Sequence, residues 1–208
     1  MVRSGSATRP ERRSIETRRA LVDAAIDVLR NEGFASATAR TIAARAGVNQ
    51  GLIFYHFDSV ANLLVCALDT VSATRLERYE EALCEVTKPS EIVELAARIF
   101  SEDLDNRDAA VLVEMVAGSI STPGLGAEVK ALMEPWTQFA ASALSQMLAD
   151  SPLAGVLEPI EMAHAIVALY LGLELLSHLD GDRSQALALF ERARRFAPLA
   201  DLFAGGAK

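Results

Sequence analysis

The sequence is poor in the residues that build catalytic and metal sites. Its 208 residues include three histidines, His56, His164 and His178, and two cysteines, Cys66 and Cys84. The cysteines lie 18 positions apart, which is no metal-ligand spacing, so we expect reduced thiols rather than a disulfide. No Ser-His-Asp order, glycine-rich phosphate loop or HExxH segment is present. We therefore expect no enzyme, no metal and no other cofactor.

Segments that direct a chain to a membrane or out of the cell are also missing. The N-terminus lacks the apolar stretch of a secretory signal. The longest strongly apolar run, residues 163–179, is interrupted by Glu174 and is shorter than the ~20 residues of a membrane span, so a buried helix explains it better. Hydrophobic residues make up 51% of the chain, enough for a substantial core. We expect a cytoplasmic globular protein with no membrane partner.

Positive charge is scarce overall but is concentrated at one end. Residues 1–57 carry nine arginines against five acidic residues, a net charge of +4. Residues 58–208 carry eleven basic and twenty-three acidic residues, a net charge of −12. The net charge of −8 for the whole chain therefore hides a basic head, which suits nucleic acid, and an acidic body that keeps phosphate backbones away.

Apolar residues recur at spacings of three and four, and proline and glycine occur mainly at breaks. This pattern predicts an all-α protein: a flexible basic arm over residues 1–14, a three-helix DNA-binding head over 15–58, and a helical effector-binding and dimerisation body over 59–208. We expect Gly33 to be a left-handed helix cap and Pro198 to kink or split the last helix. The predicted helices cover residues 15–31, 38–46, 49–57, 59–86, 90–104, 108–118, 125–149, 159–179 and 184–203.

Residues 38–57 have the spacing of a helix-turn-helix. Two short helices that cross steeply need a small residue where their backbones approach, and Ala43 supplies it. Four positions later, Gly47 tolerates the positive φ of the turn. Apolar side chains then seat both helices on the preceding one: Ile42, Val48, Ile53 and Phe57.

The remaining side chains of the second short helix face outward and suit a major groove. Gln50 can bond an adenine edge or a phosphate, and Gly51 permits close backbone approach. Leu52 either touches a thymine methyl or packs inward. Tyr55 and His56 are placed for phosphates and sugars.

The starts of the two short helices complete the DNA-binding candidates. Thr38 and Arg40 can hold the flanking strand through a hydroxyl, a helix N-terminus and a guanidinium. Asn49 caps the second short helix, beside the expected groove. Because the arm carries Arg3, Arg9, Arg12 and Arg13, we expect it to add phosphate contacts.

Residues 15–64 resemble the TetR family of bacterial regulators. The resemblance rests on Arg18-x-x-Leu-x-x-Ala-Ala25, Gly33-Phe34, Thr38, Ile42-Ala43, Ala46-Gly47-Val48, Gly51 and Phe57. It implies a helical body that holds a small effector and dimerises through its last two helices. The chain departs from the family at Phe54, where a phosphate-binding tyrosine is usual, and at Val60, where lysine is favoured. Tyr55 is adjacent and can substitute.

Polar and aromatic residues within apolar stretches of the body are the ligand candidates, because ligand pockets are mostly apolar with a few placed polar groups. The alternative for each is ordinary core packing. Trp136, the single tryptophan, is the best of them. The set consists of Phe100, Glu114, Met115, Met133, Trp136, Phe139 and Tyr170.

The last two predicted helices are apolar on more than one face, which favours a four-helix interface between two copies. Gly172 would permit close helix approach. A homodimer presents two reading helices about one turn of DNA apart, which requires a palindromic operator. The interface candidates are Leu169, Gly172, Leu173 and Leu176 on one helix and Leu187 and Phe190 on the other.

These features predict a sequence-specific transcriptional repressor of double-stranded DNA. A small hydrophobic or amphipathic effector would tilt the long helix over 59–86 and release the head from its operator. Three alternatives stay open: a ligand-activated regulator of the same fold, a helical lipid- or small-molecule-binding module with a weakened head, and an enzyme.

Overall fold

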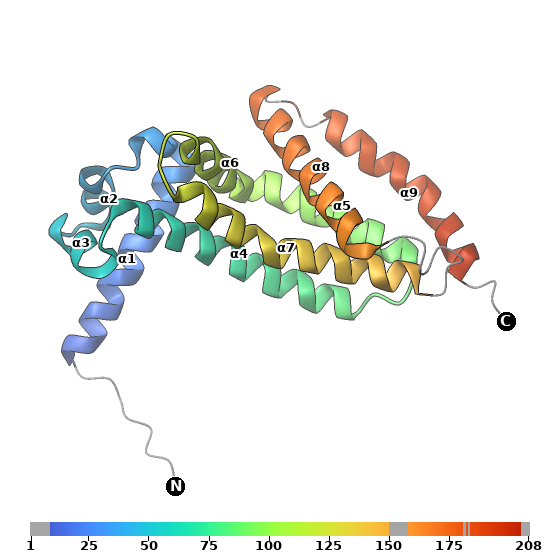
Figure 1. Cartoon of the computed structure of the whole chain (residues 1–208), viewed down its shortest axis with the longest axis horizontal. Helices are drawn as coiled ribbons and strands as arrows, with labels where there is room; N and C mark the ends of the chain where they lie inside the picture. Colours follow the sequence, from blue (N-terminus) through green and yellow to red (C-terminus); the bar gives the residue numbers. More distant parts are fainter. Residues whose placement is uncertain (1–8, 150–157, 181, 183, 205–208) are drawn as a thin grey trace, which may run out of the picture.

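The computed structural model describes residues 9–149, 158–180, 182 and 184–204, and these residues form α-helices, one 3-10 turn and no strand. An all-α fold is therefore confirmed for this part of the chain. The elements, labelled in Figure 1, are α1 (Arg9–Glu32), η1 (Phe34–Ser36), α2 (Ala39–Ala46), α3 (Gly51–Phe57), α4 (Val60–Cys84), α5 (Pro89–Asn106), α6 (Asp108–Ser119), α7 (Leu125–Leu148), α8 (Pro159–Asp180) and α9 (Ser184–Ala204).

Helices α1, α2 and α3 form a head at the end of the molecule farthest from the C-terminus (Figure 1). The turn between α2 and α3 is built as predicted: Gly47 is left-handed, with φ 68° and ψ 29°, and its N–H bonds the end of α2. Thr38 caps α2 by accepting a hydrogen bond from the Thr41 N–H. Ile42 and Ile53 are fully buried and Phe57 nearly so, which seats both short helices on α1.

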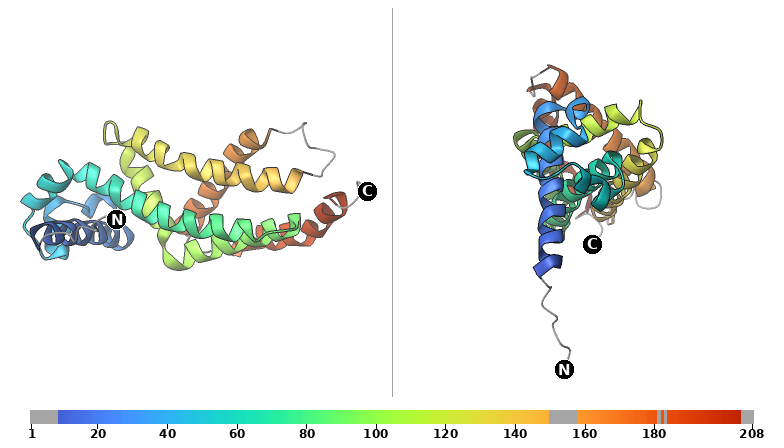
Figure 2. Two further views of the ribbon diagram at one scale, coloured as in Figure 1. Left: turned by 90° about the horizontal axis from the view of Figure 1, so that it is seen from below. Right: turned by 90° about the vertical axis from the view of Figure 1, so that its left-hand side faces the viewer.

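Helix α4 runs from the head along most of the body (Figure 2). Its first half, from Leu63 to Val71, belongs to the core of the head, where it packs on α1 and α3. Its second half contributes Tyr79 and Leu83 to a separate core with α5. The helix is thus buried in both parts of the molecule.

Helix α6 forms a second connection between head and body. The Phe34 N–H donates to a Glu114 carboxylate oxygen at 2.7 Å, and Arg30 of α1 forms an ion pair with Asp108. Gly118 is buried against the Phe34 ring, which leaves no room for a side chain there. These contacts hold the loop after α1 directly on α6.

Two local expectations are wrong, and a third is wrong in part. Residues 9–14 are helical and extend α1, while the rest of the predicted arm, with Arg3, lies outside the described residues. Gly33 has the predicted positive φ of 80°, but its ψ of 174° lies outside the left-handed helical region. Helix α9 continues past Pro198, so the proline does not split it.

We expect Gly118→Ala to lower the free energy of unfolding by about 1–3 kcal/mol, the usual cost of overpacking, because its methyl group would overlap the Phe34 ring. Gly126→Ala is the matched control, since a methyl group there meets nothing closer than 3.9 Å. Urea denaturation of both variants measures the difference. Equal stabilities would contradict the close packing of Phe34 on α6.

Candidate nucleic-acid interface and ligand cavity

Ile53 and Phe57 are the buried residues of α3, and most of the other residues of this helix, with its N-cap, form its outward face. Tyr55 is 78% exposed, and Gln50 and Gly51 are also exposed. His56 is half-buried, with its ring edge-on to Tyr55 at 4.9 Å. These side chains share one short helix at the tip of the head, where a groove could be reached.

Leu52 is partly buried and packs against the core of the head, so the inward alternative fits its position better than a base contact. Phe54, two residues later, is the apolar side chain that is more exposed, at 50%. Asn49 lies before the helix rather than at its cap, and its side-chain oxygen accepts a hydrogen bond from the Gly51 N–H at 2.8 Å. Gln50 occupies the cap position.

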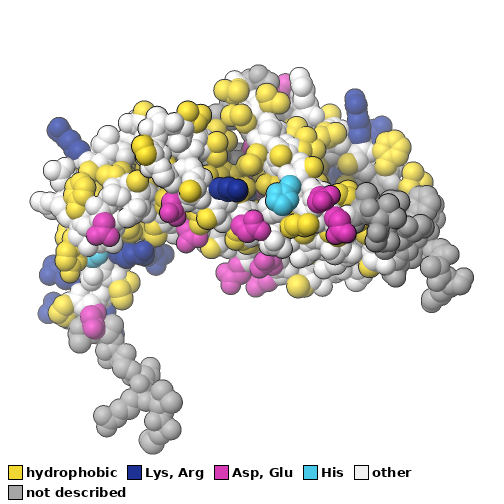
Figure 3. Space-filling model, in the orientation of Figure 1, with side chains coloured by type: hydrophobic (Ala, Val, Ile, Leu, Met, Phe, Trp, Pro, Cys, Tyr) yellow, Lys and Arg dark blue, Asp and Glu magenta, His cyan; other side chains and the backbone are white. Residues whose placement is uncertain are grey.

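Basic side chains flank this face. Arg40, in the first turn of α2, is exposed, and the neighbouring Thr38 hydroxyl is engaged in the cap of that helix. The first turns of helix α1 project away from the body (Figure 1) and carry the exposed Arg9, Arg12 and Arg13. Figure 3 shows basic side chains gathered on this end of the molecule. A concentration of this kind attracts phosphate.

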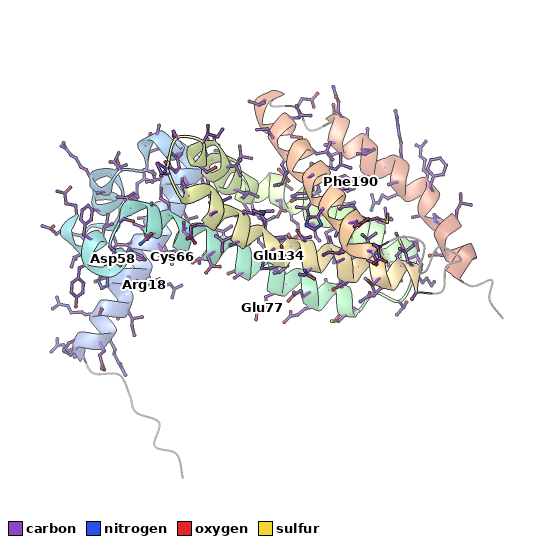
Figure 4. All side chains as sticks on the ribbon, viewed as in Figure 1. Arg18, Asp58, Cys66, Glu77, Glu134 and Phe190 are labelled. Carbon is purple, nitrogen blue, oxygen red and sulfur yellow. The ribbon has the colours of Figure 1, made fainter. Side chains whose placement is uncertain are left out.

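Arg18 joins three helices at the base of the head (Figure 4). Its guanidinium lies 5.0 Å from the centre of the Phe57 ring in α3, and it donates to the Cys66 Sγ in α4 at 3.3 Å. Arg18, the first residue of the sequence motif, therefore orients α3 on α4 and does not belong to the outward face of α3.

The body encloses a cavity of about 460 Å³ between α4, α5, α6, α7, α8 and α9. Met133, Trp136, Phe139 and Tyr170, four of the predicted ligand residues, lie on its wall. Most other wall residues are aliphatic, among them Leu68, Val71, Ile92, Leu112, Val167 and Leu173.

A buried polar cluster lies at one side of this cavity. Arg75 of α4 forms an ion pair with Asp103 of α5, which is fully buried. The Tyr170 hydroxyl donates to the same carboxylate, and the Tyr79 hydroxyl lies 3.3 Å from its other oxygen. Burial raises the pKa of Asp103, while the Arg75 guanidinium opposes that shift.

Glu174 of α8 adds a second carboxylate to the cluster and lines the cavity. It is 2% exposed, and its Oε1 has no hydrogen-bond partner among the described residues. Burial, followed by the negative charge of Asp103, raises the pKa of Glu174 to about 7. An unpaired acceptor on an apolar wall is unfavourable without a ligand, because a buried polar group normally has a partner.

Residues 21–65 match the model of bacterial regulatory proteins of the tetR family. An HTH-type transcriptional repressor of Mycobacterium tuberculosis is 38% identical over 96 residues, which cover 43% of this chain and 48% of that protein. The helix-turn-helix geometry and the helical body agree with this match. The head of this chain is therefore similar to the DNA-binding domain of the TetR family.

Two further comparisons describe how far the likeness extends. An uncharacterised HTH-type transcriptional regulator of M. tuberculosis is 29% identical over 112 residues, 54% of this chain and 57% of its own length. The alignments thus span about half the length of these relatives. The structure of FadR from Bacillus subtilis in complex with stearoyl-CoA superposes with a TM-score of 0.71 over 86% of this chain and 96% of that one, at 18% identity.

Three predicted ligand residues do not line the cavity. Glu114 bonds the Phe34 backbone at the head–body junction, and Met115 is fully buried in the core of the head. Phe100 is fully buried behind the wall, where its ring packs on Tyr170 and Phe190. Glu174, the acidic residue that does line the cavity, was only a weaker candidate from the sequence, because its place inside an apolar run equally suits a buried pair or an interface contact.

The predicted dimer residues fall into two groups. Leu169 and Leu176 of α8 are 56% and 57% exposed, and a side chain at Gly172 would meet nothing within 4 Å. Leu173, Leu187 and Phe190 are half-buried by their own chain, and their place in an interface stays a prediction. Leu173 and Phe190 line the cavity, as Leu169 also does, and Leu187 lies between α4, α5 and α9. The reason is that α9 packs on α5 of its own chain.

Glu174→Gln should stabilise the folded protein more at pH 8 than at pH 5. A pKa of about 7 in the folded state, against an ordinary 4.5, means that the carboxyl loses stability as the pH rises from about 4.5 to 7. Glutamine does not ionise, so the variant does not lose this stability as the pH rises. Thermal unfolding at both pH values measures it, with Glu161→Gln, an exposed change on the same helix, as control. A gain in Tm that is the same at both pH values would contradict the assignment.

Proposed function

We propose that this protein is a ligand-responsive, sequence-specific DNA-binding regulator, and a repressor in its unliganded state. Residues 9–58, together with the one basic residue that precedes them, Arg3, form the DNA-binding head. Residues 59–208 bind the effector and dimerise. The reading and anchoring set is Thr38, Arg40, Asn49, Gln50, Gly51, Tyr55 and His56. The relatives are transcriptional regulators of bacteria, which supports a cytoplasmic protein that is not an enzyme.

The observation that carries this proposal is that α4 belongs to both sites. Its Leu68, Val71 and Arg75 line the cavity, while its first half packs under the DNA-facing helix α3. Helix α6 repeats the arrangement: Leu112 and Val113 line the cavity, and Glu114 bonds the loop after α1. An effector that fits one position of these helices better than another would shift the head between two positions.

The effector is expected to be largely apolar, since aliphatic and aromatic side chains make up most of the cavity wall. FadR, which shares the fold, was solved with stearoyl-CoA, a molecule with a long apolar chain. Ligand-activated binding is the second candidate, because the same coupling works in either direction.

We further propose a homodimer through α8 and the exposed part of α9. Among the described residues, α8 is the one unbroken helix long and apolar enough, by length and composition, to cross a membrane, yet only 17% of that segment is buried within the chain. Figure 3 shows hydrophobic side chains over this region. A partner's copy of the same helices would cover them. The exposed apolar side chains are Ile166, Leu169, Leu175, Leu176, Leu179, Leu189, Phe196 and Leu199.

The function is tested by selecting bound fragments from a pool of random DNA duplexes. We expect enrichment of one palindromic sequence, with weaker retention after Gln50→Ala and Tyr55→Ala. Ala44→Ser, an exposed change on α2, is the control. Recovery of unenriched DNA, or equal retention by all variants, would contradict sequence-specific binding by α3.

Replacing Arg9 and Arg13 together by alanine should flatten the salt dependence of operator binding. Each lost phosphate contact reduces the slope of log K against log salt by about 0.9. The matched control is Arg192→Ala with Arg195→Ala, which removes two exposed charges from α9. Fluorescence anisotropy over a salt series provides the slopes. An unchanged slope for the α1 pair would exclude the role of this helix end.

Leu176→Glu should convert the dimer to a monomer, because it would bury charge in the proposed interface. Ile120→Glu is the control, since Ile120 is 88% exposed and lies at the end of α6, outside the proposed interface helices. Sedimentation equilibrium measures the mass, and circular dichroism checks that both variants remain helical. A dimeric Leu176→Glu protein would place the interface elsewhere.

A further inference from the structure

The cavity wall has two buried polar atoms without a partner among the described residues: the Arg75 Nε and the Glu174 Oε1. The other polar groups on the wall are engaged. Trp136 donates its indole N–H to the Ser72 hydroxyl, and Tyr170 donates to Asp103. The chemistry that a ligand meets here is therefore set by Arg75 and Glu174.

The charges of these two residues are not equally available. The Arg75 guanidinium is already paired with Asp103, and it lies over the Trp136 ring at 4.9 Å. Glu174 forms no ion pair with a basic side chain among the described residues, so the ionised cluster of Arg75, Asp103 and Glu174 by itself carries one negative charge in excess. Asp103 also affects the pKa of Glu174 more strongly than Arg75 does. The field at Glu174 is thus negative.

An anionic ligand fits this cluster poorly. Arg75 is the one basic residue on the described part of the wall, and a carboxylate or phosphate would have to share it with Asp103 while lying beside Glu174. A cationic ligand fits the cluster better, because it gives the Glu174 carboxylate a partner and neutralises the excess negative charge. A buried charge that gains a hydrogen-bonded counterion loses most of its desolvation penalty.

We propose that the cavity takes an apolar molecule that carries a protonated amine, held by the Glu174 carboxylate. This inference rests on the proposed function, because it names the chemical class of the effector for the same cavity. The ammonium donates to Glu174, and the apolar part lies among the side chains of α7 and α8, such as Phe139, Val167 and Leu173. A neutral alcohol can form the hydrogen bond but leaves the charge uncompensated.

Three probes of equal chain length separate charge from apolar fit: n-decylamine, n-decanol and n-decanoate, each below its aggregation concentration. Binding to the full chain is measured at pH 8, where the Glu174 carboxyl with its pKa of about 7 is mainly ionised. Trp136 is the single tryptophan and lies on the wall, so its fluorescence reports on the cavity. We expect decylamine to bind at least tenfold more tightly than decanol, and decanoate most weakly.

Glu174→Gln tests the partner directly. It should reduce decylamine affinity at least tenfold, to about that of decanol, and change decanol affinity less than threefold. Glu161→Gln, on the exposed side of the same helix, should leave all three affinities unchanged. Circular dichroism of each variant establishes that it is folded, so a selective loss of amine binding cannot be attributed to unfolding.

The amine assignment is overturned if decanoate or decanol binds as tightly as decylamine, or if decylamine affinity is unchanged in Glu174→Gln. If decanol or decanoate binds and releases operator DNA while decylamine has no advantage, the ligand class is wrong and the regulatory function stands. Absence of binding by all three also overturns it. The selection from random duplexes then decides the DNA-binding function independently.

Discussion

Helix α4 is buried at one end in the core of the head and at the other in the core of the body. Close-packed interiors do not deform smoothly, so α4 cannot move in one core without a response in the other. The second connection, from Phe34 and Arg30 to α6, restricts the head to few positions relative to α4. The contacts of the cavity and the orientation of α3 both depend on this shared helix.

The head could be predicted in detail from the sequence because its determinants are local. Gly47 adopts the left-handed turn that its spacing to Ala43 required, and Thr38 caps the helix that follows it. The order and bounds of the helices in the body also followed from periodicity and breaks. The start of α1 did not, since the small and charged residues before Ser14 carry little apolar periodicity and yet continue the helix.

The cavity could be predicted only in part because its wall joins six helices distant in sequence. Trp136, Phe139, Met133 and Tyr170 were found as large side chains in apolar stretches. Glu114 has the same local appearance as Glu174, but the loop after α1 makes it a junction residue. Periodicity alone does not tell which acidic residue meets a cavity and which meets a backbone N–H. The packing of α9 on α5 is likewise a long-range contact, and it half-buries Leu187 and Phe190 within the chain.

The separation of charge, +4 before residue 58 and −12 after it, has a kinetic consequence. Opposite charges at the two ends of an elongated molecule give it a large dipole moment. Near a polyanion the torque on this dipole turns the basic end inward before any contact forms, so a larger share of diffusional encounters begins in a productive orientation. The acidic body shortens non-productive encounters by repulsion. For the proposed function, this uneven distribution of charge would accelerate the search for DNA.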